Sequence, residues 1–452
     1  MATKTAPPDT GFTSATGAGQ SSNIRWFVCG LLFLATTINY MDRSVLSLIE
    51  PLLHNLAFMG WNPALDVTHQ VVFNNHYKYI IICFQIAYGC GFLFAGRFID
   101  RLGTKIGYAV AIAIWACSSM GHALVGSVIG FCLARICLGL GESGNFPAAI
   151  KAVTEWFPND ERAFATGIFN SGANAASLVA PWLIPIVTIR YGWHAAFLTT
   201  GSMGVVWLVL WIIFPYNKLR RGATETQARL APVIKPTGSL YLQLLRQRGT
   251  WAFAIAKGLT DPIWWFYLFF LPKYFHETYN LDLKHLGLPI IIIYTFSSIG
   301  SVVGGNLSGM RMRSGHTVNH GRKFALLTCA LFALPVVAVP YMHTAFGLNW
   351  WPAVGLLSLA AAAHQGWSAN IFSTPTDMFP STAISTVVGI GGAVGAASGA
   401  VFTKFTGWVW SSHPFLIFLL ASLSYVSALL IFQLMVPRLG APSEPDMPVT
   451  AP

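Results

Sequence analysis

Arg135 and Glu142 lie seven residues apart in a segment that is otherwise apolar and long enough to cross a bilayer. Seven residues are about two helical turns, so both side chains project from one helical face. An isolated charge at the centre of a membrane costs about 2.5–3.5 kcal/mol on insertion scales. The two residues are therefore either a structural ion pair between packed helices or part of a buried site for a substrate and a proton.

Two more groups of charged residues lie in apolar segments. Asp42 and Arg43 are neighbours, and neighbouring side chains diverge by about 100° around a helix. One can therefore face a central cavity while the other faces a packed helix, unless both are solvated at the outer membrane interface. Lys257 and Asp261 are four residues apart, a spacing at which they can pair with each other.

Polar and aromatic side chains that suit a sugar are scattered through other apolar segments. Amide groups offer donors and acceptors together, which suits vicinal hydroxyls, and an aromatic face suits a sugar ring. Each of them could equally hold two helices together, but as a set they predict a polar cavity. The candidate substrate-binding residues of this kind are Gln85, Tyr88, Asn170, Asn174, Gln365, Trp367 and Asn370.

The elements that must position these residues are membrane spans. Of 452 residues, 54% are hydrophobic and only 10% are charged, too few to cover the surface of a soluble protein. Apolar runs of about 20 residues recur along the chain, as in an all-α integral membrane protein. Twelve spans are predicted at about 26–48, 77–99, 106–125, 128–149, 163–187, 193–214, 250–272, 287–309, 323–342, 350–373, 384–406 and 414–436.

The basic residues predict the orientation of these spans. About nineteen of the 27 Lys and Arg residues fall on the side that holds both termini, and about five fall on the opposite side. The positive-inside rule therefore places both termini in the cytoplasm and explains the net charge of +11 without a nucleic-acid partner. The predicted parts are a disordered tail (1–24), a six-helix bundle (25–215), a cytoplasmic loop (216–249), a second six-helix bundle (250–436) and a tail (437–452).

An internal repeat supports the division into six plus six spans. Glu155-Trp-Phe-Pro158 is followed by Gly167, and Asp377-Met-Phe-Pro380 is followed by Gly389. Both motifs come after the fourth span of their half, and their offset is 222 residues. The same offset aligns Glu142 with His364, so the second half has a titratable group at the matching depth.

The loop after the second span carries the signature G-x-x-x-D-R-x-G-x-K/R, formed by Gly96, Asp100, Arg101, Gly103 and Lys105. This loop resembles that of the major facilitator superfamily, which implies two pseudo-symmetric six-helix bundles. Its aspartate can meet a helix N-terminus or a basic residue across the seam between the halves. The equivalent loop of the second half, 305–311, lacks the acid, so a gating latch is expected mainly from the first half.

Glycines suggest two further features. Residues 139–144 fit G-x-G-x-x-G, but the dinucleotide fingerprint needs a strand before it and a soluble βαβ unit. Here the residues lie in one predicted membrane helix, so the match is a coincidence. Gly391, Gly395 and Gly399 recur every four residues and predict close packing against a neighbouring helix.

No pattern in the sequence indicates an enzyme. The 7 cysteines form no C-x-x-C pair and have no histidine cluster beside them, so we expect them to be packing residues. H-E-x-x-H, G-x-S-x-G and metal-ligand clusters are absent, and no filter motif indicates a channel. We expect no cofactor and no metal; the coupling ion would be a proton.

Several segments resemble the anion:cation symporter family, and within it the bacterial hexuronate transporters. They are Asn39-Tyr-Met-Asp42-Arg43, Arg135 to Pro147, Glu155 to Arg162, Phe169-Asn-Ser-Gly172, Thr260-Asp-Pro-Ile-Trp-Trp-Phe-Tyr-Leu268 and Ala363-His-Gln-Gly-Trp-Ser-Ala-Asn370. The resemblance covers about residues 25–436 and implies uptake of glucuronate or galacturonate by proton symport. It implies protonatable acids at Asp42 and Glu142, anion-binding arginines at Arg43 and Arg135, and a substrate contact at Tyr88.

A mechanism follows from these residues. An unpaired Arg135 would bind a carboxylate through two hydrogen bonds, and burial would favour the protonated form of Glu142 at an acidic outer face. Proton and sugar acid would then load together and let the two halves rock. The alternatives are a symporter for another organic anion (an aldonate, aldarate or aromatic acid) and an anion exporter. The expected setting is a monomer in a bacterial inner membrane, with a small sugar-acid anion, a proton and the bilayer as its partners.

Overall fold

The structure is a computed structural model that describes residues 18–53, 59, 66–219, 240–281, 283–344, 346–410 and 412–439. Residues 1–17 of the predicted N-terminal tail, 220–239 of the central loop and 440–452 of the C-terminal tail lie outside the described residues. The first helix begins at Ala18, so the predicted tail of 24 residues was too long. Hydropathy marks only the apolar part of a helix, and this helix continues through polar residues before the apolar segment.

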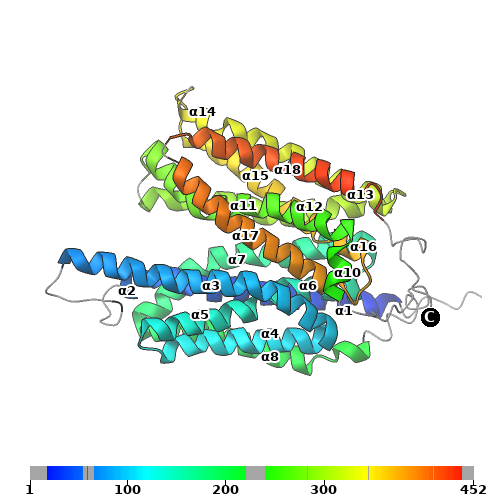
Figure 1. The fold of residues 1–452 in the computed structure, drawn as a ribbon, viewed down its shortest axis with the longest axis horizontal. Coiled ribbons are helices and arrows are strands. Elements are labelled where there is room, and N and C mark those ends of the chain that lie inside the picture. Colours follow the sequence, from blue (N-terminus) through cyan, green and yellow to red (C-terminus); the bar gives the residue numbers. More distant parts are fainter. Residues whose placement is uncertain are drawn as a thin grey trace, which may run out of the picture.

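The described residues form helices in two groups, and Figure 1 shows one group above the other. The lower group contains α1 (Ala18–Leu48), α2 (Glu50–Leu53), α3 (Asp66–Leu102), α4 (Thr104–Gly121), η2 (His122–Leu124), α5 (Val128–Glu142), α6 (Asn145–Trp156), α7 (Asn159–Tyr191) and α8 (Trp193–Ile213). The upper group contains α10 (Leu240–Leu245), α11 (Arg248–Tyr279), α12 (Leu283–Arg313), α13 (Val318–Ala333), η4 (Leu334–Ala338), α14 (Val339–Thr344), α15 (Trp350–Ile371), α16 (Thr374–Met378), α17 (Ile384–Val409) and α18 (Pro414–Met435).

All twelve predicted spans correspond to helices. Within the described part of the chain, nine helical segments are long and apolar enough to cross a membrane by length and composition. The remaining three predicted spans are α5 with α6, α11 and α15. These helices hold the charged or polar side chains of Glu142, Lys257 and His364, all of them buried between helices or facing a cavity.

The fourth span is not one helix, as predicted for 128–149, but two. The chain turns at Ser143 and Gly144, where the Gly144 amide donates to the Gly141 carbonyl at 3.1 Å. Pro147 has no amide proton to continue the ladder to Ser143, and its ring crowds that carbonyl. The residues that mimic a dinucleotide fingerprint therefore lie at a bend between two membrane helices rather than inside one helix.

The two glycines of the internal repeat occupy matching places between the groups. A Cβ added to Gly167 of α7 would collide with the carbonyl oxygen of Ser301 in α12. A Cβ added to Gly389 of α17 would collide with the carbonyl oxygen of Phe92 in α3. The groups thus meet along two equivalent helix pairs, α7 with α12 and α17 with α3, as the repeat predicts.

The three glycines of α17 all face α11. A Cβ on Gly391 would meet the ring of Phe253, one on Gly395 would meet Asp261, and one on Gly399 would meet Trp265. The predicted close packing is confirmed. The close packing also holds Asp261 against the backbone of α17 at Gly395.

Candidate substrate-binding site

A cavity of about 470 Å³ lies between the two groups of helices, within the size range of small-molecule sites. Its wall comes from α1, α3, α5, α6, α7, α11, α15 and α17. Six of the predicted site residues line it: Arg43, Gln85, Tyr88, Arg135, Asn170 and Gln365. The lining part of α1 is its C-terminal end and that of α3 is its middle, from Tyr77 to Phe92, so the cavity lies away from the loop that follows α3.

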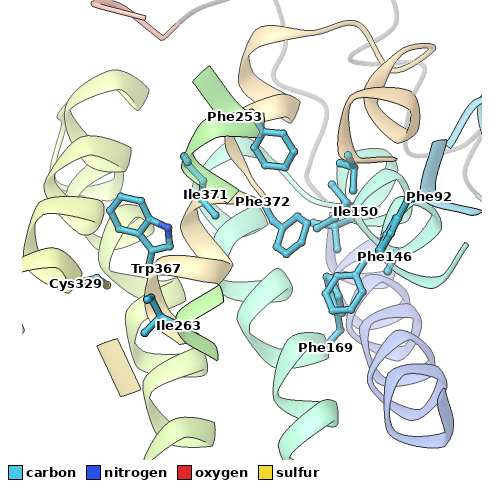
Figure 2. Packing of buried hydrophobic residues seen from close by; sticks show 14 of the residues in the cluster. Phe92, Phe146, Ile150, Phe169, Phe253, Ile263, Cys329, Trp367, Ile371 and Phe372 are labelled. Carbon is cyan, nitrogen blue, oxygen red and sulfur yellow. The ribbon is translucent and has the colours of Figure 1, made fainter. Parts of the chain in front are cut away.

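A pair of stacked rings forms the end of the cavity nearer that loop. Phe146 of α6 and Phe372, which follows α15, have ring centroids 5.2 Å apart and planes 20° apart. Both rings line the cavity, and Figure 2 shows them facing each other between the two groups, with Phe92, Ile150 and Phe169 beside Phe146. This apolar layer separates the cavity from the ion pairs of the loop side.

Glu142 pairs with Arg43, and the structure shows no ion pair between Glu142 and Arg135 among the described residues. Arg43 donates from Nε at 3.1 Å and from Nη2 at 2.8 Å to Oε2 of Glu142. The other carboxylate oxygen, Oε1, has no hydrogen-bond partner among the described atoms. The guanidinium of Arg43 also lies over the rings of Tyr40 and Tyr88, 4.7 and 4.4 Å from their centroids. These aromatic faces stabilise a cation that is largely removed from water.

Among the described residues of the cavity wall, Arg135 is the cation without a carboxylate in contact. It is only 2% exposed, lines the cavity, and keeps Nε and Nη2 without a hydrogen-bond partner among the described atoms. Its guanidinium lies 5.8 Å from the ring centroid of Phe84. A buried guanidinium with free donors leaves unmet hydrogen-bonding capacity that a carboxylate could satisfy with two parallel bonds.

Asp42 points away from the cavity. It is fully buried, its Oδ1 accepts a 2.6 Å hydrogen bond from Ser119 of α4, and its Oδ2 has no partner among the described atoms. The predicted divergence of Asp42 and Arg43 is therefore confirmed, and solvation of both at an outer interface is wrong. The structure places Asp42 inside the first group of helices, behind the wall of the cavity.

The second group contributes its own ion pair to the cavity. Nζ of Lys257 lies 2.8 Å from Oδ1 of Asp261, and both residues line the cavity. His364, which the repeat aligns with Glu142, also lines it and stacks on Trp264 with centroids 5.1 Å apart. Nδ1 of His364 lies 2.7 Å from the hydroxyl of Tyr425, so the imidazole is held on two sides.

Two of the predicted amides bridge the groups of helices. Nδ2 of Asn170 in α7 donates to Oε1 of Gln365 in α15 at 2.6 Å. Ser368, one turn further along α15, lies 3.4 Å from the same Asn170 nitrogen. Since all three line the cavity, their hydrogen bonds can be exchanged for bonds to a polar ligand.

Three predicted substrate contacts do not line the cavity. Asn174 is fully buried and its Oδ1 accepts from Ser297 of α12 at 3.5 Å, while Asn370 donates to the carbonyl of Gly304 at 2.7 Å. Trp367 is fully buried inside the second group, where Figure 2 shows it on the side of Cys329, and it does not line the cavity. All three hold helices together, because one turn of a helix carries a side chain from the cavity to a neighbouring helix.

Sequence reasoning missed several aromatic residues of the wall. Tyr40, Tyr77, Phe84 and Trp264 line the cavity. A signal was available for two of them: Tyr40 precedes Arg43 by three residues and Trp264 follows Asp261 by three. Helical spacing puts such pairs on one face, so a charged residue at the cavity predicts its aromatic neighbour there.

The signature loop forms a latch between the groups. Asp100 accepts from Nζ of Lys151 at 2.8 Å, from the amide of Thr386 at 2.8 Å and from the Thr386 hydroxyl at 2.6 Å. The predicted helix N-terminus across the seam is therefore present, because Thr386 lies in the first turn of α17, whereas the basic partner Lys151 belongs to the first group itself. A Cβ on Gly96 would collide with the carbonyl of Ser385, which keeps α3 against that turn.

The other signature residues serve the loop itself. Gly103 has φ of 81°, a conformation that favours glycine, and it precedes the first turn of α4. Lys105 donates from Nζ to the carbonyl of Phe214 at 3.1 Å, just past the end of α8. Arg101 is exposed at the end of α3.

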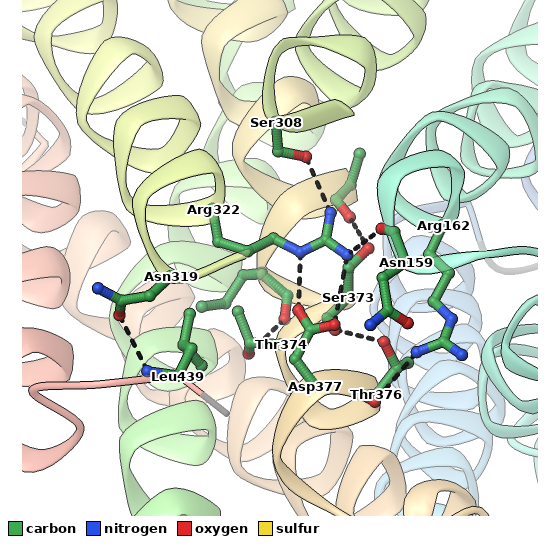
Figure 3. A network of polar contacts seen from close by, with 12 residues as sticks. Asn159, Arg162, Ser308, Asn319, Arg322, Ser373, Thr374, Thr376, Asp377 and Leu439 are labelled. Atoms are coloured by element: carbon green, nitrogen blue, oxygen red, sulfur yellow. Dashed lines mark hydrogen bonds and ion pairs between the residues drawn. The ribbon is translucent and has the colours of Figure 1, made fainter. Parts of the chain in front are cut away.

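A second latch, which the sequence did not predict, lies in the other half. Arg322 of α13 is fully buried, donates to Asp377 at 2.7 Å and to the carbonyl of Asn159 at 2.8 Å, and so joins the second group to the start of α7 (Figure 3). Arg162 of α7 donates to the carbonyl of Thr376 at 3.2 Å across the same seam. The expectation of a latch mainly from the first half was wrong, since Arg322 and Arg162 donate to backbone carbonyls across the seam without an acid in the loop 305–311.

Comparison with known proteins agrees with this geometry. Residues 32–403 match the Major Facilitator Superfamily. The chain belongs to this superfamily. It is 28% identical over 398 residues to the hexuronate transporter of Escherichia coli (strain K12), covering 85% of this chain and 87% of that one.

Two further comparisons place this superfamily transporter among known proteins. It is 26% identical over 393 residues to the probable galactarate/D-glucarate transporter of Bacillus subtilis (strain 168), covering 82% of each chain. Among solved structures it resembles the proton:xylose symporter XylE, with a TM-score of 0.74 and 15% identity over 93% of this chain and 97% of that one. The fold of two six-helix groups is therefore established, and the chain is a multi-pass membrane transporter of small molecules rather than an enzyme.

Proposed function

We propose that this transporter imports a sugar acid, a hexuronate such as glucuronate or galacturonate, together with protons by alternating access. The observation that carries the proposal is the buried guanidinium of Arg135, which faces the cavity with free donors. The sugar would contact Tyr88, Gln85, Asn170 and Gln365. Relatives at about the same level of identity include transporters named for hexuronate and for aldarates, which supports a sugar acid as the substrate class.

Glu142 would couple the proton to the substrate through Arg43. In the structure the Glu142 carboxylate accepts hydrogen bonds from Nε and Nη2 of Arg43. A proton on Glu142 removes the charge that holds this pair and weakens its hydrogen bonds. Arg43, which already faces the cavity beside the Tyr88 ring, would then join Arg135 in holding the substrate carboxylate.

Asp42 would be a second protonatable group in this scheme. Its fully buried Oδ2 has no hydrogen-bond partner among the described atoms, which leaves this oxygen available to a proton. The hydrogen bond from Ser119 would remain in either state. Protonation of Asp42 would therefore affect the first group of helices rather than the substrate.

Release of the substrate would require the latch side to open. The stacked rings of Phe146 and Phe372, which both line the cavity, would close it toward the latch. We place this side, with both termini, in the cytoplasm of a bacterium, so the structure would represent the state that is closed to the cytoplasm. The transporter would work as a monomer in the inner membrane, with no cofactor beyond the coupling proton.

Uptake by proteoliposomes tests the proposal. With an inward proton gradient, labelled glucuronate or galacturonate should accumulate above its outside concentration, and a protonophore should abolish that accumulation. Gluconate, glucarate and an aromatic acid compete in parallel to separate the hexuronate proposal from the other organic-anion symporters. Accumulation that ignores the gradient, or efflux driven by it, would contradict proton-coupled import.

A further inference from the structure

A second ion pair faces the cavity and has no role in the proposed coupling of proton and substrate. Lys257 and Asp261 of α11 lie 2.8 Å apart, and their side chains are 6% and 21% exposed. Both line the cavity from the second group of helices, whereas Arg135 lines it from the first. A substrate in the cavity would therefore have a guanidinium on one side and a lysine–aspartate pair on the other.

The pair is held in a fixed position. Nζ of Lys257 lies 3.9 Å from the ring centroid of Phe372, and Asp261 presses against Gly395 of α17, where a Cβ would collide with its Oδ2. Burying two charges costs more than packing apolar side chains of the same size, so such a pair is weakly explained as a device for stability. A role in ligand binding explains the pair better, because its hydrogen-bonding groups line the cavity.

Charge balance limits what this pair can bind. Arg43 is matched by Glu142, and Lys257 is matched by Asp261, which leaves Arg135 as the one cation of the described cavity wall without a carboxylate in contact. Asp42 does not line the wall and accepts a hydrogen bond from Ser119 instead. The wall thus complements one negative charge, and it complements that charge at the Arg135 side.

We propose that Lys257 and Asp261 form a subsite for the hydroxyl-bearing, uncharged end of the substrate, and that their charge neutrality selects monocarboxylate sugar acids against dicarboxylates. An ammonium donates and a carboxylate accepts, so the pair can bind two neighbouring hydroxyls at once. A second carboxylate at this position would find no net positive charge to balance it, and an unbalanced charge is costly in a site removed from water. This inference rests on the proposed transport of a sugar acid.

The test compares the binding of glucuronate, a monoanion, with that of glucarate, a dianion of similar size, to the purified transporter in lipid nanodiscs. The wild type should bind glucuronate at least about tenfold more tightly than glucarate. Asp261→Asn removes the carboxylate that balances Lys257 and so raises the net charge of the pair from zero to plus one, and glucarate affinity should therefore rise about tenfold relative to glucuronate. Glu277→Gln is the matched control, because Glu277 forms the same i,i+4 pair with Lys273 on the same helix but does not line the cavity.

The outcomes separate this inference from the proposed function. Equal binding of glucarate and glucuronate by the wild type would overturn the subsite, and that result needs no variant to fold. An affinity ratio that is the same in Asp261→Asn and Glu277→Gln would also overturn it. The double variant Lys257→Gln/Asp261→Asn should keep the wild-type preference while binding both ligands more weakly, and a switched preference there would contradict the charge argument. If the wild type binds no sugar acid at all, the proposed function itself fails.

Discussion

Asp100→Asn should shift the transporter away from the state that is closed on the latch side. The side chain of Asp100 is fully buried and holds the first turn of α17 through the amide and hydroxyl of Thr386 and, at 3.3 Å, the amide of Ser385. Its pair with Lys151 lies within the first group, so only the bonds to α17 break when the seam opens. Asparagine keeps one acceptor oxygen but loses the charge and the second acceptor.

The magnitude follows from those bonds. A hydrogen bond to a charged group contributes about 1.5–3 kcal/mol, and the substitution removes or neutralises the equivalent of one or two of them. We therefore expect the closed state to lose about 2–4 kcal/mol relative to the open state. At about 1.4 kcal/mol per tenfold change, the lower figure alone shifts the equilibrium about 30-fold.

Hydrogen exchange measured by mass spectrometry in nanodiscs can detect this shift from the closed toward the open state. Peptides that contain residues 384–390 of α17 and 96–103 of α3 should exchange faster in Asp100→Asn, because their contact opens more often. Asp160→Asn is the matched control, since Asp160 also lies at the seam but its ion pair among the described residues is a partly exposed one with Arg313, at 4.0 Å. Unchanged exchange of both segments, or an equal change in the control, would refute the role of the latch.

Two other predictions concern the cavity and the seam. Arg135→Lys keeps the charge but loses the planar fork, so affinity for glucuronate should fall about 10- to 100-fold in the same nanodisc binding assay, and an unchanged affinity would argue against two parallel bonds. Gly389→Ala places a methyl group against the Phe92 carbonyl, and should raise exchange on the latch side by weakening the closed seam by about 1–3 kcal/mol. Gly121→Ala is its control, because no other described part of the chain lies within 4 Å of a Cβ added there, and equal effects of the two would contradict the steric argument.

Much of the fold could be predicted from the sequence, because the bilayer imposes strong rules. Apolar length and basic-residue asymmetry mark spans almost independently of tertiary packing, and the repeat around Gly167 and Gly389 predicts how the halves are related. The break between α5 and α6 was missed. It depends on Pro147 within an apolar run, and prolines in membrane helices are often tolerated without a break.

The site was predicted less completely, for a geometric reason. Arg43, Arg135 and Gln85 line the cavity, but Asn174 and Trp367 lie behind its wall. A residue type suited to a ligand says nothing about the rotation of its helix, and about 100° separates neighbouring side chains. Spacing from a residue that must face the cavity is a better guide, as Tyr40 and Trp264 show.

Pairing between charged residues was the hardest feature to predict. Glu142 and Arg135 share a helix and a face, so a pair or a shared site between them was the natural expectation. The partner of Glu142 is instead Arg43 of α1, at 2.8 Å. Which of several buried cations meets a given acid depends on how helices distant in sequence are juxtaposed, and no local pattern contains that information. The same holds for Arg322 and Asp377.

The central claim is that a proton on Glu142 controls substrate loading through Arg43. Glu142→Gln mimics the protonated acid, so proteoliposomes carrying this variant should still exchange internal and external labelled glucuronate. They should no longer accumulate it when an inward proton gradient is imposed. Exchange with lost accumulation is the result we predict. Accumulation at the wild-type level in Glu142→Gln would contradict the account.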